Sequence, residues 1–328
     1  MKKKRYLVTG GTGFIGSSLV RRLVKEGNFV RVLDNDIRGA QDRLSDIKGK
    51  IEIVKADIRV YDEVKAACNE IDSVIHLAYI NGTEYFYKMP ELVLEVAVKG
   101  MMNILDSCIK ENIKEFILAS SSEVYQSPKE IPTSEDVPLI VPDVMNPRFS
   151  YGGGKIICEL LAINYSRKHF DRMMIFRPHN VYGPDMGWEH VLPQFVLRMK
   201  EISSKEKGKK IRFPIQGDGS ETRSFVFIDD FIDGIMIMLK KGKHMNIYHI
   251  GTMDEISIKD AAVSIGNYFK KRVEIVKGKD AKGGTKRRCP NISKLSALGY
   301  KPKVSFIKGA EITTRWYDEN SSKIRKIK

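Results

Sequence analysis

Cysteine is scarce in this sequence, and its placement indicates no metal centre. The four cysteines, Cys68, Cys108, Cys158 and Cys289, lie far apart and lack the spacing of metal ligands. Two of them fall in expected helices beside apolar residues, so buried and reduced thiols are the predicted state. We therefore predict neither disulfides nor a bound metal.

Long hydrophobic runs are also missing. No stretch approaches the roughly 18 consecutive apolar residues that a membrane-spanning helix requires. Met1–Arg5 is basic like the start of a signal peptide, but a short strand and a glycine turn follow it instead of an apolar segment with a cleavage site. We therefore expect a cytoplasmic protein without a membrane partner.

Acidic residues are fewer than basic ones. The chain has 41 Asp and Glu against 56 Lys and Arg, a formal net charge of +15. The basic residues are spread along the chain without an aromatic-interleaved stripe, and their cluster at Lys200–Arg212 is expected to be a solvated loop. Nucleic acid is therefore not favoured as a partner, whereas a basic protein would attract a doubly charged nucleotide substrate.

A glycine motif near the start of the chain is the first informative feature that is present. Gly10, Gly13 and Gly16 lie between a short apolar run and an amphipathic run. In such a strand–turn–helix unit the first glycine permits the turn, and the second lets the backbone approach a pyrophosphate. The third lets the helix pack close to the strand, so that its N-terminus faces the phosphates.

An acidic residue follows the motif at the distance expected for a dinucleotide site. Asp34 ends the second apolar run and would bind the adenosine ribose diol. A carboxylate there repels a 2′-phosphate, which favours NAD over NADP, although Arg38 lies four residues further on.

Apolar runs alternate with helical patterns through the first half, which is typical of a parallel sheet with crossover helices. We predict an α/β fold, a Rossmann-type doubly wound parallel sheet with a smaller, interleaved C-terminal substrate lobe. Residues 1–180 would form the dinucleotide domain, to which a strand and helix at about 225–250 return, and residues 181–224 and 251–328 the second lobe. Expected strands are 6–8, 29–33, 51–55, 73–78, 116–119, 173–177 and 246–250; the long expected helices are 90–112 and 151–169.

Three side chains after the fifth strand form a catalytic pattern. Tyr151 and Lys155 are four residues apart and would lie on one face of a helix, with Ser121 at the strand end. A lysine ammonium beside a phenol would lower the phenol pKa, so that the phenolate could take a hydroxyl proton. The serine would hold the same substrate oxygen.

The chain resembles the extended short-chain dehydrogenase/reductases, specifically the NAD-dependent nucleotide-sugar epimerase/dehydratase family, along nearly its whole length. The resemblance rests on Thr9–Gly16, Asp57–Ile58, His76–Ala78, Ser121 with Tyr151 and Lys155, Arg177–Pro184, Arg223–Asp230 and Asn291–Lys294. It implies an NAD-dependent enzyme that oxidises a nucleotide-diphosphate sugar at C4 to a 4-keto intermediate, for the synthesis of surface-glycan precursors.

The resemblance also implies roles for individual residues. Tyr151 would be the base, Lys155 would tune it and bind the nicotinamide ribose, and Ser121 would assist. The sugar nucleotide would be held by Asn180, Arg223 and one of Arg287 or Arg288, with Arg148 as a further candidate, because a guanidinium fork matches phosphate oxygens. The residues expected to bind NAD are Gly10, Thr12, Gly13, Phe14, Ile15, Gly16, Asp34, Asn35, Asp57, Ile58, Leu77, Ala78, Tyr151 and Lys155.

The fate of the 4-keto intermediate depends on two further residues, Ser122 and Glu123, which are counted with the catalytic candidates. Ser121-Ser122-Glu123 is close to the pattern of UDP-glucuronate decarboxylases, and Glu123 would sit at the rim of the active site unless it is only a capping carboxylate. Ser122 is a poor general acid for loss of water. Epimerisation, dehydration and decarboxylation stay open at this point, and Ala97, Gln126 and Asn291 replace residues common in the family.

The remaining expectations concern the oligomeric state, the places of three histidines and one alternative to an enzyme. The family resemblance implies a homodimer through a four-helix bundle of the helices at 90–112 and 151–169. Of the histidines, His76 is expected in the core, His179 is assigned a positional role, and His190 could reach substrate. The alternative outside enzymology is a non-catalytic NAD- or RNA-binding protein on the same fold, against which the intact Ser–Tyr–Lys set argues.

Overall fold

The computed structural model describes residues 3–206, 208–279 and 285–323, so Met1 and Lys2 of the basic N-terminal segment lie outside the described residues. Its centre is a seven-stranded sheet of order β11-β6-β5-β4-β1-β2-β3, with every pairing parallel. The predicted Rossmann-type α/β fold is thus confirmed. The strands are β1 (Arg5–Thr9), β2 (Phe29–Asp34), β3 (Glu52–Lys55), β4 (Ser73–His76), β5 (Glu115–Ala119), β6 (Arg172–Pro178) and β11 (Asn246–Ile250).

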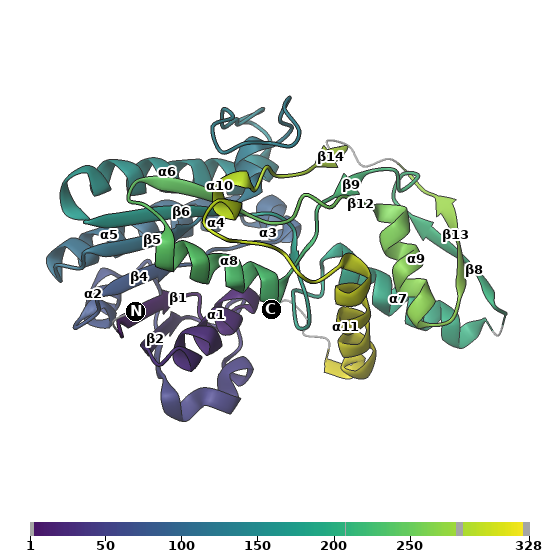
Figure 1. Ribbon diagram of the computed structural model, residues 1–328, viewed down its shortest axis with the longest axis horizontal. Helices are drawn as coiled ribbons and strands as arrows, with labels where there is room; N and C mark the ends of the chain where they lie inside the picture. Colours follow the sequence, from purple (N-terminus) through teal and green to yellow (C-terminus); the bar gives the residue numbers. More distant parts are fainter. Residues whose placement is uncertain (1–2, 207, 280–284, 324–328) are drawn as a thin grey trace.

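Helices cover both faces of this sheet (Figure 1). One face packs against α1 (Phe14–Lys25) and α8 (Ile228–Lys241), and the other against α2 (Tyr61–Cys68), α5 (Met101–Lys110) and α6 (Ser150–His169). Successive strand residues point to opposite faces, so Val8 joins one hydrophobic core and Leu7 the other. Burial on both sides explains why these strands read as continuous apolar runs.

The long helix expected at 90–112 is present, but its middle is a π-helical turn. It consists of α4 (Pro90–Glu95), the π segment Val96–Gly100 and α5 (Met101–Lys110), with helical backbone angles at the junctions. Gly100 packs directly on Ile58, since a Cβ at this glycine would come 2.7 Å from the Ile58 Cγ1 atom. The π turn therefore lies against a residue that is expected to flank the adenine.

A second group of elements lies beyond the carboxyl ends of the strands (Figure 1). There α7 (Val191–Lys205), α9 (Ile258–Tyr268) and α11 (Phe306–Glu319) pack together, beside a parallel pair of β8 (Lys210–Ile215) and β13 (Arg272–Lys277). The remaining elements are β7 (Val181–Tyr182), β10 (Val226–Phe227), β9 (Thr222–Arg223), β12 (Ile256–Ser257), β14 (Arg287–Arg288), α3 (Thr83–Lys88), α10 (Ser293–Ser296) and 3₁₀ turns at Gln41–Lys50, Ser122–Tyr125, Pro147–Phe149 and Ser321–Lys323.

One expectation about this region is wrong. Lys200–Arg212 is not a solvated loop, because α7 runs to Lys205 and β8 begins at Lys210. In β8 the side chains of Ile211, Phe213 and Ile215 are buried, while the intervening residues are exposed. Lys205 is exposed on the helix, Lys210 and Arg212 are exposed on the strand, and Lys207 lies outside the described residues.

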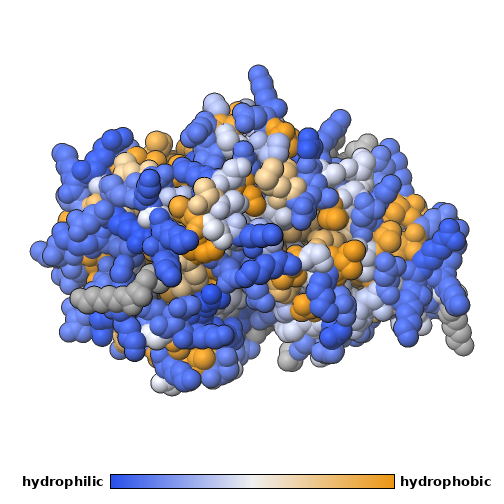
Figure 2. All heavy atoms as spheres, in the orientation of Figure 1, coloured by the Kyte–Doolittle hydropathy of each residue, from blue (hydrophilic) through white to orange (hydrophobic). Residues whose placement is uncertain are grey.

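The cysteines, the helices and the surface also bear on the expectations from the sequence. All four cysteines are buried and free, as predicted. Within the described residues, none of the helices has the length and apolar character needed to cross a membrane. The face in Figure 2 is mostly hydrophilic, with hydrophobic residues in scattered places.

Candidate functional site

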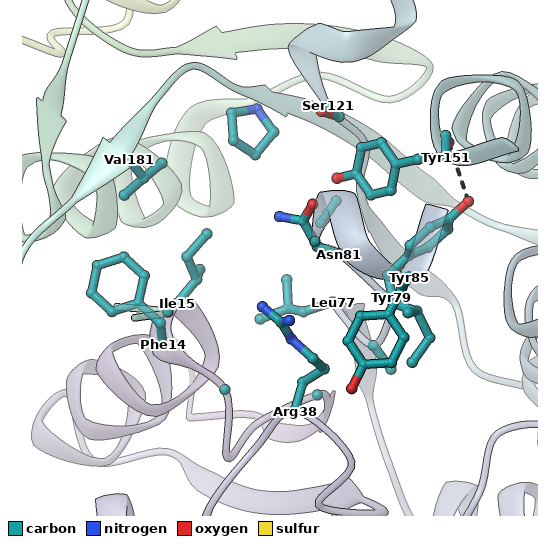
Figure 3. A pocket seen from close by; sticks show the side chains of 18 of the residues that line it. Phe14, Ile15, Arg38, Leu77, Tyr79, Asn81, Tyr85, Ser121, Tyr151 and Val181 are labelled. Atoms are coloured by element: carbon teal, nitrogen blue, oxygen red, sulfur yellow. Dashed lines mark hydrogen bonds between the residues drawn. The ribbon is translucent and has the colours of Figure 1, made fainter. Parts of the chain in front are cut away.

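A cavity of about 590 Å³ opens at the carboxyl ends of β1, β2, β4, β5 and β6. This edge of a doubly wound sheet is where such folds bind ligands. Figure 3 shows Phe14, Ile15 and Val181 on one side of the cavity and Tyr79, Tyr85 and Tyr151 on the other. The cavity therefore lies between the glycine motif and the predicted catalytic residues.

The glycine motif forms a cradle that fits a dinucleotide. Gly10 has a left-handed φ of 70°, and a Cβ there would lie 2.7 Å from the backbone nitrogen of Ala78. No described side chain caps the first turn of α1, which begins at Phe14. Its N–H groups are thus available to a pyrophosphate, to which the helix N-terminus also offers a favourable dipole.

The expected adenosine end of the cavity is built from β2 and the segment after β3. Asp34 accepts hydrogen bonds from the backbone N–H groups of Thr12 and Asp36, each at 3.0 Å, which fixes its carboxylate at the cavity wall. Asn35 donates to Asp57 at 3.1 Å. Hydrogen bonds from Arg59 lower the pKa of Asp57 to about 2, so that this carboxylate is ionised.

Arg38, which raised the alternative of a 2′-phosphate, has a different partner. Its guanidinium donates to the Glu189 carboxylate across the cavity and lies 5.5 Å from the centre of the Tyr85 ring. Figure 3 shows it pointing into the cavity. The arrangement leaves Asp34 as the acidic residue at the end of β2, as the glycine motif requires.

The structure brings together the three residues of the predicted catalytic pattern. Ser121 follows β5, while Tyr151 and Lys155 lie on one face of α6, and all three line the cavity. Ser121 interacts with the Tyr151 phenol, and Figure 3 shows the two side chains near one another. The Lys155 ammonium donates to the carbonyl oxygen of Ala119 at 2.7 Å and lies 3.8 Å from the centre of the Tyr79 ring.

The expected lowering of the Tyr151 pKa is wrong. Burial raises the pKa of Tyr151 to about 12, against a lowering effect of the hydrogen bond with Ser121. Phe86 and Tyr79 pack their rings 5.0 and 5.1 Å from the Tyr151 ring and help to exclude water. Burial also lowers the pKa of Lys155 to about 8, which leaves it protonated at neutral pH.

Glu123 forms an ion pair inside the cavity. Arg288 donates to its carboxylate at 2.5 Å, and both side chains line the cavity together with Arg148. Burial alone would raise the pKa of Glu123, but the charge of Arg288, with those of Arg148 and Arg223, brings it below its ordinary value. The carboxylate is therefore ionised at neutral pH, and guanidinium groups outnumber it.

Most of the other predicted site residues line the cavity, and two do not. Gly13, Gly16, Ile58, Leu77, Ala78, Ser122 and Asn180 are on its wall. Thr12 is fully buried behind it and donates its backbone N–H to Asp34 and its hydroxyl to Asp36, while Arg223 lies outside the lining and influences Glu123 through its charge. Of the two adjacent candidates, Arg288 faces the cavity, whereas Arg287 pairs with Glu255.

The sequence analysis missed a group of lining residues after β4. Tyr79, Asn81 and Tyr85 line the cavity, and in Figure 3 the Asn81 amide points into it. The Tyr79 hydroxyl donates to the backbone oxygen of Tyr151 at 3.3 Å. Their position just beyond a parallel strand was the available signal, because the carboxyl ends of such strands meet at one edge.

The histidines divide as expected between core and cavity. His76 is buried in β4 with its Nδ1 atom 2.8 Å from the Thr9 hydroxyl, and burial lowers its pKa to about 3. His179 is fully buried, and His190 lines the cavity.

Comparison with known proteins gives consistent results. Residues 6–251 match the family model described as the NAD dependent epimerase/dehydratase family. The chain is 31% identical to a UDP-N-acetyl-alpha-D-glucosaminuronate decarboxylase from Bacillus cytotoxicus, over 97% of this chain and 98% of that protein. It is 32% identical to UDP-glucuronic acid decarboxylase 6 from Arabidopsis thaliana, over 93% and 86% respectively.

Solved structures with the same fold are also similar to this chain. A dTDP-glucose 4,6-dehydratase from Streptomyces venezuelae, crystallised with NAD, superposes with a TM-score of 0.86 at 29% identity and covers 99% of this chain and all of that one. Decarboxylases, dehydratases and epimerases thus all occur among the proteins that are similar to this chain.

Proposed function

The chain belongs to the NAD-dependent epimerase/dehydratase family, and from that premise we propose that it is a nucleotide-sugar decarboxylase. Its substrate would be a nucleotide-diphosphate sugar with a carboxylate at C6. Oxidation at C4 would make this carboxylate part of a β-keto acid, and the carboxylate would leave as carbon dioxide. The observation that carries this proposal is the ionised Glu123, paired with Arg288 and surrounded by further guanidinium groups.

The first step would use the residues around the Tyr151 phenol. Bound NAD supplies the acceptor for the hydride at C4. The Tyr151 oxygen would take the proton of the C4 hydroxyl while the Ser121 hydroxyl holds the same sugar oxygen. Because burial raises the pKa of Tyr151 to about 12, the phenol needs positive charge nearby to act as a base, and we assign that charge to the buried Lys155 ammonium, which follows one turn later on α6.

The second step needs no acid from Glu123. When the C5–C6 bond breaks, its electron pair is delocalised from C5 onto the C4 oxygen, and the protonated Tyr151 would donate a hydrogen bond to that oxygen. Carbon C5 would then take a proton from water, and Tyr151 would return its proton to the C4 oxygen as the C4 ketone is reduced. Arg148 and Arg288 line the cavity and could hold the departing carboxylate by charge-assisted hydrogen bonds.

The same residues argue against dehydration. Loss of a hydroxyl from C6 requires a proton donor beside it, and the lowered pKa of Glu123 means that this carboxyl has no proton to donate at neutral pH. Ser122, the neighbouring candidate, is buried and is a weak acid. The two relatives described above, with 31% and 32% identity over most of both chains, are decarboxylases, which supports the same choice.

The test is a panel of substrates followed by mass spectrometry in deuterated water. UDP-glucuronate and UDP-N-acetylglucosaminuronate should lose carbon dioxide and gain one deuterium at C5, while UDP-glucose and dTDP-glucose should yield no dehydrated product. Loss of water from a neutral sugar, or an epimer without loss of mass, would replace the proposal by a dehydratase or an epimerase.

A single variant tests the catalytic role of the phenol. Tyr151→Phe should lower kcat about 10²- to 10⁴-fold, the range expected for a positioned acid–base group. Tyr165→Phe on the same helix, outside the cavity lining, is the matched control and should keep full activity. Undiminished turnover by Tyr151→Phe would contradict the mechanism, whereas a wild type that binds NAD and converts none of the sugars would favour a binding protein on this fold.

We also propose a division of labour within the chain and a homodimer. Residues 1–180, with the returning segment at about 225–250, would bind NAD, and residues 181–224 and 251–328 would bind the sugar nucleotide. Asn180 ends the first part and Arg288 belongs to the second, and the fact that both line one cavity supports this division. The helices α4–α5 and α6 would form the dimer interface, and a role of the product in surface-glycan synthesis stays a prediction.

A further inference from the structure

A buried ion pair lies beneath the cavity and takes no direct part in the proposed reaction. Glu159 lies one helical turn after Lys155 on α6, and its carboxylate binds the Arg177 guanidinium through Nε at 2.9 Å and Nη2 at 2.6 Å. The two side chains are only 3% and 2% exposed. Removing two charges from water in this way is costly, and the cost is offset only when further hydrogen bonds satisfy the groups.

The additional hydrogen bonds of this pair lead to the segment that carries the site. The Ser120 hydroxyl, next to Ser121, donates to the Glu159 carboxylate. The other side of the Arg177 guanidinium donates to the Tyr125 hydroxyl and, at 2.8 Å, to the carbonyl oxygen of Glu135. Ser120 and Tyr125 are thus the two ends of the short segment that contains Ser121, Ser122 and Glu123.

The direction of each hydrogen bond in the outer branch is fixed. His249 has its Nδ1 atom 3.1 Å from the backbone oxygen of Asn291, which can only accept, so Nδ1 carries the proton. Burial lowers the pKa of His249 to about 3, so the ring is neutral and its Nε2 atom accepts from the Tyr125 hydroxyl at 2.7 Å. That hydroxyl in turn accepts from Arg177. The network therefore has a single arrangement.

We infer that Glu159 is a positioning residue, which fixes the segment from Ser120 to Tyr125 against helix α6. The segment carries the serine and the glutamate of the cavity, and the helix carries the tyrosine and the lysine. A shift of either element would change the distance between the Ser121 hydroxyl and the Tyr151 phenol, on which the proposed oxidation depends. This inference rests on the proposed function only for its kinetic consequence.

The experiment removes one link without removing a charge. Ser120→Ala deletes the bond to Glu159 and leaves the ion pair in place. Ser166→Ala is the matched control, because Ser166 is equally buried on α6 and its hydroxyl donates at 2.5 Å to the Ala162 carbonyl, away from the cavity. Ser120→Ala should lower kcat tenfold or more with KM within about twofold, whereas Ser166→Ala should keep kcat.

A second variant tests the charge of Glu159 itself. Glu159→Gln keeps the shape and can still accept from Ser120, but it no longer matches the Arg177 guanidinium. We expect a larger fall in kcat than for Ser120→Ala, again with KM little changed and with wild-type circular dichroism. Loss of kcat in proportion to loss of folded protein, or equal effects of Ser120→Ala and Ser166→Ala, would reduce the network to a structural role and overturn the inference.

Hydrogen exchange separates failure of this inference from failure of the proposed function. Backbone amides of residues 120–126 should exchange faster in Ser120→Ala than in Ser166→Ala, because one end of the segment loses its bond to Glu159 on α6, and this measurement needs no substrate. Unchanged exchange in both variants would refute the positioning role even if the wild-type enzyme decarboxylates. Faster exchange combined with an inactive wild type would support the positioning role and refute the function.

Discussion

Lys155 is held where its charge is disfavoured, and this gives a prediction at the scale of one residue. Burial lowers its pKa from 10.5 to about 8, while the unfolded chain keeps the ordinary value. Between these two pH values the unfolded chain retains a proton that the folded protein has released, so stability must rise with pH. At 1.36 kcal/mol per pH unit the rise amounts to about 3 kcal/mol.

The measurement is urea unfolding of NAD-free protein at pH 7.5 and pH 10, for the wild type and Lys155→Met. Because the two pH values span most but not all of the titration, the difference in unfolding free energy between the two proteins should shift by about 2 kcal/mol toward the wild type at the higher pH. Lys303→Met, at a side chain that is 73% exposed, controls for the loss of a lysine. A difference that does not vary with pH would contradict the burial of the Lys155 ammonium.

The same residues show what the sequence could and could not predict about the site. The spacing of Tyr151 and Lys155 predicts their common helical face, which the structure has. The direction of the Tyr151 pKa could not be predicted, because it depends on rings that pack on it from another segment. Nor could sequence choose between Arg287 and Arg288, since neighbouring residues of an extended strand point to opposite sides and only packing decides which side is the cavity.

At the scale of elements, α6 contains near its start three consecutive glycines, Gly152 to Gly154, that differ in their surroundings. A Cβ at Gly152 would lie 2.6 Å from the Gln126 side-chain nitrogen, and one at Gly154 would collide with the Tyr79 hydroxyl and lie 3.0 Å from the Ala97 Cβ. At Gly153 the nearest atom is a Val141 methyl carbon at 3.6 Å, an ordinary contact. Close packing of the helix on the cavity wall thus requires two of the three glycines.

Gly153→Ala should therefore stabilise the protein by about 0.5–1 kcal/mol, because alanine loses less backbone entropy in a helix. Activity should not change. Gly154→Ala is the contrasting variant and should destabilise by about 1–3 kcal/mol through overpacking, with loss of activity as Tyr79 moves. Thermal and urea unfolding of both variants provide the check, and equal effects at the two positions would refute the difference in packing.

The sequence predicts the strands that are buried on both faces, but it failed to predict β8, which is buried on one face only. The inner strands of the central sheet, such as β4 and β5, are buried on both faces and appear in the sequence as apolar runs. β8 alternates buried and exposed residues, and the basic side chains at Lys210 and Arg212 occupy its solvent face. The concentration of basic residues at 200–212 led to the expectation of a loop. It hides the alternation of buried and exposed residues, which becomes clear only when the segment is followed to Ile215.

At the scale of the whole molecule, two neighbouring helices carry apolar side chains on the surface. Leu94 and Met102 lie on the α4–α5 helix, and Ile157 and Leu160 are three residues apart on α6, which packs beside it. Leu160 is 55% exposed and Leu94 39%. This apolar face supports the homodimer that we propose from the family resemblance, in which each protomer would contribute two helices to a bundle.

Leu160→Asp should convert that dimer into a monomer, because an interface of this kind cannot accommodate an unpaired charge in its apolar centre. Light scattering coupled to size exclusion should give the wild type a mass of twice the 37.3 kDa chain and the variant a mass of one chain. Ile307→Asp is the matched control, since Ile307 on α11 is 74% exposed and lies away from these helices. A wild type that elutes as a monomer, or a control that dissociates equally, would contradict the assignment of this face, because surface charge alone would then account for the change.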